Sequence, residues 1–352
     1  MLTKLHLKNF KGFRDTEVPA LRKVNLIVGG QNVGKTSLLE AVVFAAGDTE
    51  ETKNSLSNLP QIFRPNEGAD SVRFWTSLIG TPKSPIDILV ITTFGDVSHL
   101  MGGYANDESV ASADNYFQSE FGKVSSMHVG QVALQVAGLG RVDWIHGVKS
   151  DDVRITLRQP ASLNRTELET PESFPVFPMS AIAQVSLYGQ LVTRKRKKAV
   201  VELLKKIEPR LESIDAVAPD GEHRVYADLS DGEVLPLSQL GHGFTRLFEL
   251  YSGLAVTESK LALIDEIENG VHYSALPTLF QGIRELADSN GVQSIITTHS
   301  LEAIKAACEV FKDRPEDFQL IRLERTDDDN IRAVAINDEN LKVVMASGWE
   351  MR

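Results

Sequence analysis

Apolar and polar positions in the first part of the chain predict two strands and a helix. Within residues 4–10 they alternate, which is typical of a strand with one buried face, and Lys11 and Gly12 indicate the turn that follows. The segment 24–28 is almost unbroken in apolar residues, so we expect a central strand buried on both faces. Apolar residues at helical spacing then predict a helix over 35–46.

The middle of the chain changes to a period of two, which predicts half-buried antiparallel strands. The alternation covers about 71–158 and is clearest at 132–136 and 153–158. Inside it, residues 101–128 are polar, contain glycine and show no period. A long loop or a small insertion is expected there.

A helical arm is expected after a proline-rich stretch at 171–178. The segment 187–214 has apolar residues at helical spacing, and Pro209 interrupts it. A short helical pair therefore fits this segment better than a long coiled coil.

The last third of the chain returns to alternating strands and helices, which is typical of an α/β domain. The expected elements are buried strands at 261–264 and 294–297, a helix at 276–286, and two alternating strands around 320–323 and 331–336 with a turn at 327–330. We expect two halves of one parallel-sheet domain, split by an insertion. The expected parts are 1–70 and 233–352 for the halves, 71–178 for a β-rich lobe and 179–232 for the helical arm.

Composition excludes several classes of protein. The 352 residues are 42% hydrophobic and 24% charged, which is ordinary for a globular chain with a full core. No segment approaches the roughly 20 apolar residues that cross a bilayer, and the N-terminus is strand-like, so a cytoplasmic protein without a membrane partner is expected. Cys308 is alone, which leaves a buried thiol as the expected state. A net charge of −11 argues against coating of nucleic acid, although a local basic face could still bind phosphates.

A phosphate-binding loop is expected between the second strand and the first helix, where the sequence reads G-G-Q-N-V-G-K-T. Glycines allow backbone N–H groups to turn towards phosphates, while Lys35 supplies a positive charge and Thr36 a hydroxyl for Mg²⁺. The alternative is a glycine-rich turn with an accidental Lys-Thr pair. The candidate nucleotide-binding residues are Gly29, Gly30, Gln31, Asn32, Val33, Gly34, Lys35, Thr36 and Ser37.

Two carboxylates follow the buried strand at 261–264. Asp265 is expected to hold Mg²⁺ and Glu266 to orient or deprotonate an attacking water, because the ends of parallel strands present the chemistry of such sheets. The alternative is a solvated helix N-cap. Glu268 is interpreted as structural. At the end of the next strand, His299 is a candidate sensor of the γ-phosphate, against the alternative of a structural histidine.

Together these segments resemble the ABC-like ATPase heads of the RecF, SMC and OLD proteins. The resemblance is carried by L-H-L-K-N-F-K-G-F at 5–13, the strand and loop at 24–42, L-A-L-I-D-E-I-E-N-G-V-H-Y-S at 261–274, and I-I-T-T-H-S at 295–300. It implies an α/β P-loop NTPase of the ABC-ATPase-head type with an inserted antiparallel β and helical subdomain. It also implies that two copies clamp ATP and Mg²⁺ between them in a head-to-head homodimer or higher even oligomer.

The resemblance further implies a signature motif that completes the site of the opposite copy. Its position is 237–246, L-S-Q-L-G-H-G-F-T-R, which departs from L-S-G-G-Q. Ser238, Gly241 and Gly243 are its candidate nucleotide contacts, against the alternative of an ordinary glycine-rich loop. Residues 269–272 would form the family's D-loop, and Gln61 is the candidate for its Q-loop glutamine.

OLD nucleases carry a Toprim domain after the histidine motif, and only about fifty residues follow it here. Asp327, Asp328 and Asp329 offer a D-x-D pattern between two alternating strands, where a hairpin turn is the favoured interpretation. A nuclease or toxin would then be a separate effector chain.

A basic run at the start of the expected arm is a candidate nucleic-acid contact, against the alternative of a solvated helix face. Its residues are Arg194, Lys195, Arg196, Lys197 and Lys198. We expect an ATP hydrolase that acts as a nucleotide-gated switch in prokaryotic anti-phage defence or DNA transactions. The alternatives are an ATP-stabilised scaffold or nucleic-acid-binding module and a RecF-like DNA repair ATPase.

Overall fold

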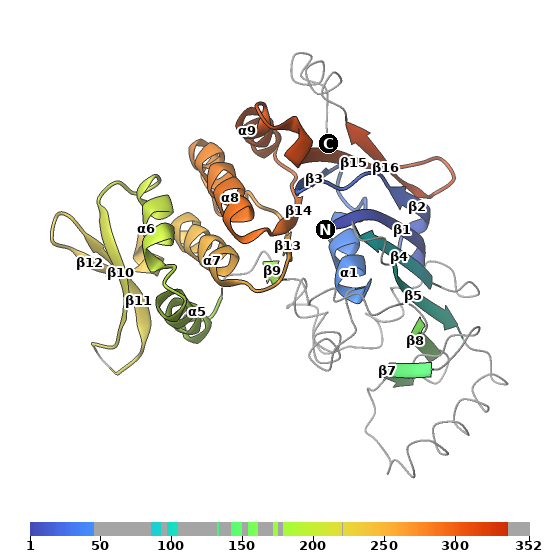
Figure 1. Cartoon of the computed structure of the whole chain (residues 1–352), viewed down its shortest axis with the longest axis horizontal. Coiled ribbons are helices and arrows are strands. Elements are labelled where there is room, and N and C mark those ends of the chain that lie inside the picture. The colour runs from blue at the N-terminus through green and yellow to red at the C-terminus, as the bar shows by residue number, and fades with distance from the viewer. Residues whose placement is uncertain are drawn as a thin grey trace, which may run out of the picture. The chain divides into compact units, whose positions relative to one another are not determined.

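The computed structural model divides the chain into two compact units (Figure 1). It describes residues 1–45, 86–92, 97–104, 132–133, 142–149, 154–160, 172–174, 179–219 and 221–336. The first unit comprises Met1–Leu21, Asn32–Thr170 and Arg322–Ala335. The second comprises Arg22–Gln31, Pro171–Ile321 and Ile336–Arg352.

An antiparallel sheet dominates the first unit. Its strand order is β2-β1-β4-β5-β8-β7-β6. The strands are β1 (Leu2–Phe10), β2 (Phe13–Val18), β4 (Ile86–Thr92), β5 (Val97–Tyr104), β6 (Val132–Ala133), β7 (Val142–Lys149) and β8 (Arg154–Pro160). The expected strand at the N-terminus and the antiparallel strands of the middle region are therefore confirmed as strands, and they share one sheet.

This sheet changes the expected division of the chain. The boundary at residue 70 does not separate two units, because β1 pairs with β2 on one edge and with β4 on the other. A strand at the edge of a sheet has backbone N–H and C=O groups without hydrogen-bond partners. Strand β4 provides these partners for the second edge of β1. Residues 101–104, expected in a loop, belong to β5, while 105–128 lie outside the described residues.

The turn between β1 and β2 is tied to helix α1 (Lys35–Ala45). Lys11 has a positive φ of 51° and pairs its ammonium with the carboxylate of Glu40, which is fully buried on α1. A buried carboxylate is costly unless it is paired, so this ion pair fixes which face of α1 meets the turn.

The turn between β15 (Phe318–Arg325) and β16 (Ile331–Ile336) is a hairpin, as the sequence predicted for 327–330. Asp329 accepts a bond from Arg14 at 3.1 Å and also pairs with Arg325. The side chain of Asn330 accepts the N–H of Arg14 at 3.0 Å. Asp329 and Asn330 therefore hold a hairpin turn, which is the interpretation favoured over a D-x-D metal site.

The second unit contains the parallel sheet. The strands of this unit that run parallel are β3 (Val24–Val28), β14 (Gln293–Thr297), β13 (Leu261–Ile264) and β9 (Glu172–Phe174), and they belong to a six-stranded sheet of order β16-β15-β3-β14-β13-β9. Every residue of β3, β13 and β14 is buried, which confirms the strands expected from unbroken apolar runs.

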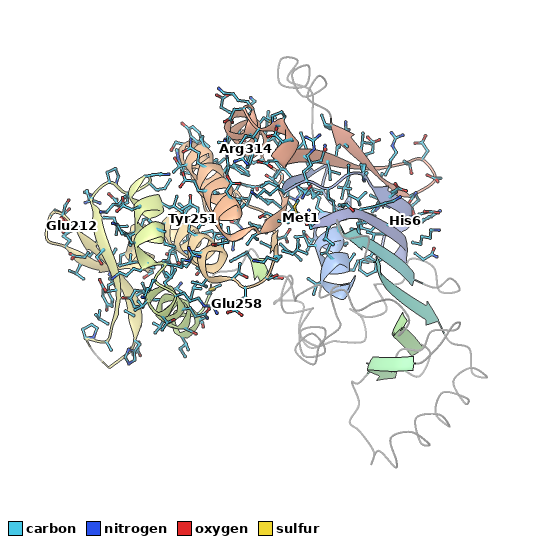
Figure 2. The ribbon with its side chains drawn as sticks, viewed as in Figure 1. Met1, His6, Glu212, Tyr251, Glu258 and Arg314 are labelled. Carbon is cyan, nitrogen blue, oxygen red and sulfur yellow. The ribbon has the colours of Figure 1, made fainter. Side chains whose placement is uncertain are left out.

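Three helices accompany this sheet: α7 (His242–Val256), α8 (Leu276–Asn290) and α9 (Leu301–Phe311). Helix α8 packs against both α7 and α9. At the crossing with α7, the buried Tyr251, labelled in Figure 2, donates to the Thr278 carbonyl at 3.0 Å. A Cβ atom on Gly282 would lie 2.4 Å from the Tyr251 ring, so only glycine allows the two helices this approach.

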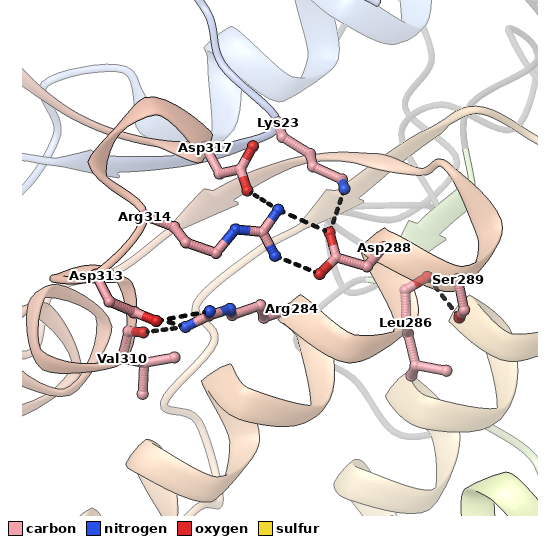
Figure 3. A network of polar contacts seen from close by, with 9 residues as sticks. All are labelled: Lys23, Arg284, Leu286, Asp288, Ser289, Val310, Asp313, Arg314 and Asp317. Carbon is pink, nitrogen blue, oxygen red and sulfur yellow. Dashed lines mark hydrogen bonds and ion pairs between the residues drawn. The ribbon is translucent and has the colours of Figure 1, made fainter.

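Polar contacts on the surface link α8 to the segment after α9 (Figure 3). Arg284 makes a bidentate pair with Asp313 at 2.8 and 2.9 Å and donates to the Val310 carbonyl. Arg314 donates to Asp288 at 2.6 Å, and Lys23 pairs with the same carboxylate. Exposed pairs contribute at most about 1 kcal/mol each, so their main effect is to orient the segment between α9 and β15.

The region expected to be a helical arm is only half helical. Helices α5 (Ala181–Thr193) and α6 (Lys197–Lys205) form, but 211–236 form a three-stranded antiparallel sheet of β10 (Leu211–Val217), β11 (Arg224–Leu229) and β12 (Val234–Pro236). The helical interpretation of 206–214 is therefore wrong. The register of β10 shifts between Leu211 and Ser213, so Leu211 and Ile214 are both buried at a spacing of three. This spacing resembles that of a helix and explains the wrong interpretation.

A charged cluster links α5, α6 and β10. Asp215 accepts bonds from Lys197 at 2.6 Å, from the Ser213 hydroxyl at 2.8 Å and from the Tyr188 hydroxyl at 2.9 Å. Burial acts to raise the pKa of Asp215, but these hydrogen bonds together lower it. Burial likewise acts to lower the pKa of Lys197, and its bonds to Asp215 raise it.

The Asp215 cluster predicts a pH-dependent stability. Because the pKa of Asp215 is lowered on folding, its contribution is complete above its unfolded value near 3.9 and is lost as the pH falls below it. We expect Asp215→Asn to reduce the free energy of unfolding by about 1 kcal/mol at pH 7, discounted for solvent exposure, and by much less at pH 3. Urea unfolding at both pH values measures this, with Asp228→Asn as the matched control. An equal loss at both values would contradict the prediction.

Candidate functional site

The parallel register brings three loops to one edge of the sheet. Ile27 of β3 pairs with Thr297 of β14, and Ile264 of β13 pairs with Ile296 of β14. The carboxyl ends of the three strands therefore lie side by side, and the chain leaves them at 29, 298 and 265. Such an edge is where parallel sheets bind their ligands.

The phosphate loop leaves β3 in the conformation that its glycines allow. Gly29 and Gly34 have φ values of 144° and 89°, and Asn32 has a φ of 58°. A Cβ atom on Gly34 would lie 3.0 Å from the ring of Phe13, so a side chain is excluded by both backbone and space. Lys35 is only 5% exposed and begins α1, as expected. The loop begins in the second unit and continues into the first from Asn32.

Asp265 is held by a threonine of the neighbouring strand. Its side chain is 3% exposed, and Oδ1 accepts the hydroxyl proton of Thr297 at 2.6 Å. The same hydroxyl accepts the N–H of Glu266 at 2.9 Å. Thr297 therefore fixes both acidic residues after β13, although the sequence interpretation gave it no role.

Glu266 and His299 face each other at this edge. His299 Nε2 lies 3.5 Å from Glu266 Oε1, and both side chains are 39% exposed. Glu266 has a φ of 43°, a left-handed conformation that costs a residue with a side chain about 1–2 kcal/mol. Backbone strain of this kind clusters at functional sites, where the surrounding structure enforces it.

A buried arginine lies behind the acidic pair. Arg246 of α7 is 6% exposed and donates to the Asp265 carbonyl at 3.2 Å. Burial lowers its pKa, and the nearby carboxylates of Glu249, Asp265 and Glu266 oppose this shift. Arg246 entered the sequence interpretation only as the last residue of the signature segment. Its contact with Asp265 joins residues 19 apart in the chain, and no local sequence pattern indicates it.

The signature segment forms a short 3₁₀ turn and then the start of α7. Ser238 is exposed in the turn Leu237–Leu240, and Gly241 precedes α7 with a φ of 92°. Gly241 and Gly243 therefore lie at a helix start, as predicted. A Cβ atom on Gly243 would lie 2.5 Å from the carbonyl oxygen of Gly270. The signature segment and the turn at 269–272 thus touch within one chain.

This close approach makes Gly243 sensitive to substitution. We expect Gly243→Ala to destabilise the protein by about 1–3 kcal/mol, because the added methyl group meets the backbone of Gly270 and displaces it. Gly189→Ala on α5 is the matched control, since a Cβ there meets no atom within 4 Å. That control is expected to be neutral or stabilising. Urea unfolding of both variants measures the difference, and equal stabilities would contradict the expectation.

The basic run is partly used inside the chain. Arg194 pairs with Glu258 at 2.8 Å and donates to the Val256 carbonyl, and Lys197 pairs with Asp215. Lys195, Arg196 and Lys198 remain exposed. Nucleic-acid binding by this run stays a prediction.

Other expectations have mixed outcomes. Cys308 is buried on α9, as predicted, and burial raises the pKa of its thiol to about 12. Gln61 lies outside the described residues. In the part of the chain that the structure describes, no helix has the length and apolar character needed to span a bilayer.

The fold and the motifs at this edge are similar to those of P-loop ATPases, and two family models of ATPase domains match the chain. Residues 1–119 match the family model described as an AAA ATPase domain, and residues 149–305 match that described as an AAA domain, putative AbiEii toxin, Type IV TA system. These matches agree with the resemblance to the RecF, SMC and OLD group.

Known relatives span most of the chain. An "ATP/GTP phosphatase" of Helicobacter pylori is 23% identical over 350 residues, which cover 89% of each chain. The solved SMC head bound to the C-terminal winged-helix domain of ScpA has a TM-score of 0.55 at 13% identity and covers 97% of this chain and 99% of its own. An SMC head with an extended coiled coil, bound to a ScpA domain from Pyrococcus furiosus, has a TM-score of 0.54 at 11% identity and covers 98% of both. At these identities the two structures show the fold alone.

Proposed function

We propose that two copies of this chain clamp Mg-ATP between them and hydrolyse it, so that the nucleotide gates their association. The observation that carries the proposal is the shared edge of β3, β14 and β13, where the phosphate loop, His299 and the acidic pair all begin. A phosphate-binding loop beside two carboxylates and a histidine is the donor set that phosphoryl transfer to water requires.

Chain continuity supports the participation of Lys35. The loop at Gly29–Gln31 belongs to the same unit as Asp265 and His299. Lys35 follows Gln31 by four residues, and four extended residues span at most about 14 Å. In the proposal, Lys35 neutralises the β- and γ-phosphates, and the N–H groups of the loop orient them.

The remaining roles follow from the environment of each side chain. Glu266 orients or deprotonates the attacking water, since its carboxylate is half-exposed at the strand end. His299 contacts the γ-phosphate and reports its presence. Ser238, Gly241 and Gly243 present donors to the nucleotide of the opposite copy, where the exposed start of α7 supplies N–H groups.

The residues present fit a magnesium ion. Asp265 is a carboxylate at a strand end whose orientation Thr297 fixes, and Thr36 offers a hydroxyl at the start of α1. Mg²⁺ favours few protein oxygens together with water and substrate phosphates. When bound, it would neutralise charge that develops on the phosphoryl oxygens.

Two observations support a proposal for the biological setting. The family model that matches 149–305 is described as an AAA domain, putative AbiEii toxin, Type IV TA system, and both structural relatives were solved with a bound ScpA domain. We infer a switch in prokaryotic anti-phage defence that works with a separate effector chain.

Size measurement tests this function against the scaffold alternative. We expect a monomer with ADP or no nucleotide and a dimer with Mg²⁺ and a non-hydrolysable ATP analogue, measured by light scattering, alongside phosphate release from ATP. A stable oligomer that ignores the nucleotide would favour the scaffold. Absence of phosphate release would contradict the proposed hydrolysis.

A further inference from the structure

Glu268 holds the end of strand β14 with both of its carboxylate oxygens. Its Oε2 accepts the hydroxyl proton of Thr298 at 2.7 Å, and its Oε1 accepts the backbone N–H of His299 at 2.6 Å. Hydrogen bonds to an ionised acceptor are about twice as strong as those between neutral groups. Two consecutive residues of one loop are therefore anchored to a single carboxylate.

Glu268 binds the chain between the end of β14 and the start of α9, where neither strand nor helix hydrogen bonds fix the backbone. The hydrogen bonds between β14 and β3 continue as far as Thr298, whose N–H donates to the Ile27 carbonyl at 3.1 Å. Helix α9 begins at Leu301, and Ser300 caps it by accepting the N–H of Ala303 at 3.1 Å. His299 lies between these two elements, and its N–H goes to Glu268. The position of His299 thus depends on a side chain from the turn that follows β13.

Thr298 makes the anchor cooperative. A hydroxyl has one proton, and a carboxylate can only accept, so the proton of Thr298 points towards Glu268. Its oxygen then accepts the N–H of Ser300 at 3.0 Å. Linked hydrogen bonds of this kind polarise one another. Removing the carboxylate of Glu268 would therefore weaken the hydrogen bonds that fix residues 298–300.

The main chain of Glu268 holds a second loop. Its carbonyl accepts the N–H of Val271 at 3.0 Å, which closes the turn at 269–272. Gly270 of that turn lies against Gly243 at the start of α7. One residue thus connects the loop of His299 with the turn that touches the signature segment.

We propose that Glu268 is the positioning residue of His299 and joins it to the turn at 269–272. In this proposal Glu268 determines where the side chain of His299 lies at the candidate site, whereas the sequence alone indicated a structural role. The consequence for turnover rests on the proposed function, whereas the anchoring of the loop does not. The competing explanation is a tie that stabilises the fold and has no influence on His299.

A double-mutant cycle separates the two explanations. We expect Glu268→Gln to lower kcat about 10- to 100-fold with little change in KM, because a small misplacement of a catalytic group has effects of this size. In the His299→Ala background the same substitution should lower kcat less than about twofold, because the group that it positions is gone. An equal fall in both backgrounds, or a kcat of Glu268→Gln close to wild type, would overturn the proposal.

Thr298 supplies a pair of variants that does not alter the carboxylate. Thr298→Val keeps the shape but removes the hydroxyl, and we expect it to lower kcat in the same direction as Glu268→Gln. Thr298→Ser keeps the hydroxyl and should restore most of the activity. If valine and serine at this position give the same kcat, the hydroxyl bond to Glu268 does not position His299.

Hydrogen exchange tests the anchor without any turnover. In the full-length protein, peptides covering 297–302 should exchange faster in Glu268→Gln than in wild type, while the remaining peptides stay unchanged. Glu212→Gln, an exposed carboxylate on β10, is the matched control. Unchanged exchange at 297–302 would overturn the anchor itself. If wild type releases no phosphate from ATP but the exchange changes as expected, the proposed hydrolysis fails and the anchor stands.

Discussion

Lys35→Ala is expected to lower ATP hydrolysis at least about 100-fold and to weaken ATP binding. Lys35 is almost completely buried at the start of α1, and a buried ammonium is retained only where opposite charge compensates it. Its removal leaves the phosphates of the nucleotide without that compensation, and the loss of one preorganised donor costs about 10²–10³ in kcat. Phosphate release and the binding of a fluorescent ATP analogue measure the two effects.

The control for this variant is Lys305→Ala, which removes an exposed lysine from α9. It should hydrolyse ATP at the rate of the wild type. Hydrolysis by Lys35→Ala at the same rate as this control would show that the segment 29–36 does not bind the phosphates.

Glu266→Gln is expected to separate nucleotide binding from hydrolysis. The substitution keeps the shape of the side chain but removes its basicity, and a positioned general base contributes about 10²–10⁴-fold to the rate. We therefore expect kcat to fall in that range while ATP affinity stays within a few-fold of wild type. The dimer should then persist with ATP itself, because the gating nucleotide is no longer consumed.

Steady-state kinetics and light scattering in ATP check this prediction. Glu212→Gln, the exposed carboxylate on β10, is again the control and should leave both measurements unchanged. A Glu266→Gln variant that turns over at the wild-type rate would assign the base to another residue. A variant that loses ATP affinity as well would place Glu266 in binding instead of hydrolysis.

The parts of the fold that could be predicted are those in which local sequence and burial agree. Strands 24–28 and 261–264 were predicted correctly because strands buried on both faces read as unbroken apolar runs. The hairpin at 327–330 followed from alternation on either side of a polar turn. In contrast, the pairing of β1 with β4 joins segments far apart in the chain, and no local pattern specifies it.

The arm shows how a local pattern can mislead. Leu211 and Ile214 have helical spacing, and only the irregular register between β10 and β11 reveals that a strand can bury both. Pro209 was read as a break within a helical pair, whereas the chain changes from helix to strand around it.

At the candidate site, the sequence predicted the groups with an obvious chemical role and missed those that hold them. The sequence predicted Asp265, Glu266 and His299 at the ends of buried strands, and the structure places them at one edge of the sheet, while their chemical roles stay a prediction. Thr297 was not predicted, and Glu268 was interpreted as structural without a partner, because the partners of both are set by the register of β13 against β14. A pair of threonines directly before a strand-end histidine is the signal that could have indicated them.

The last residue of β14 and the residue after it bond to different carboxylates: Thr297 bonds to Asp265, and Thr298 bonds to Glu268. Successive side chains of an extended chain point to opposite sides, so neighbouring threonines reach carboxylates on opposite sides of the chain. Deleting or inserting one residue in β14 would turn the hydroxyl of Thr297 away from Asp265 and that of Thr298 away from Glu268. The segment should therefore accept serine for threonine but tolerate no change in its length.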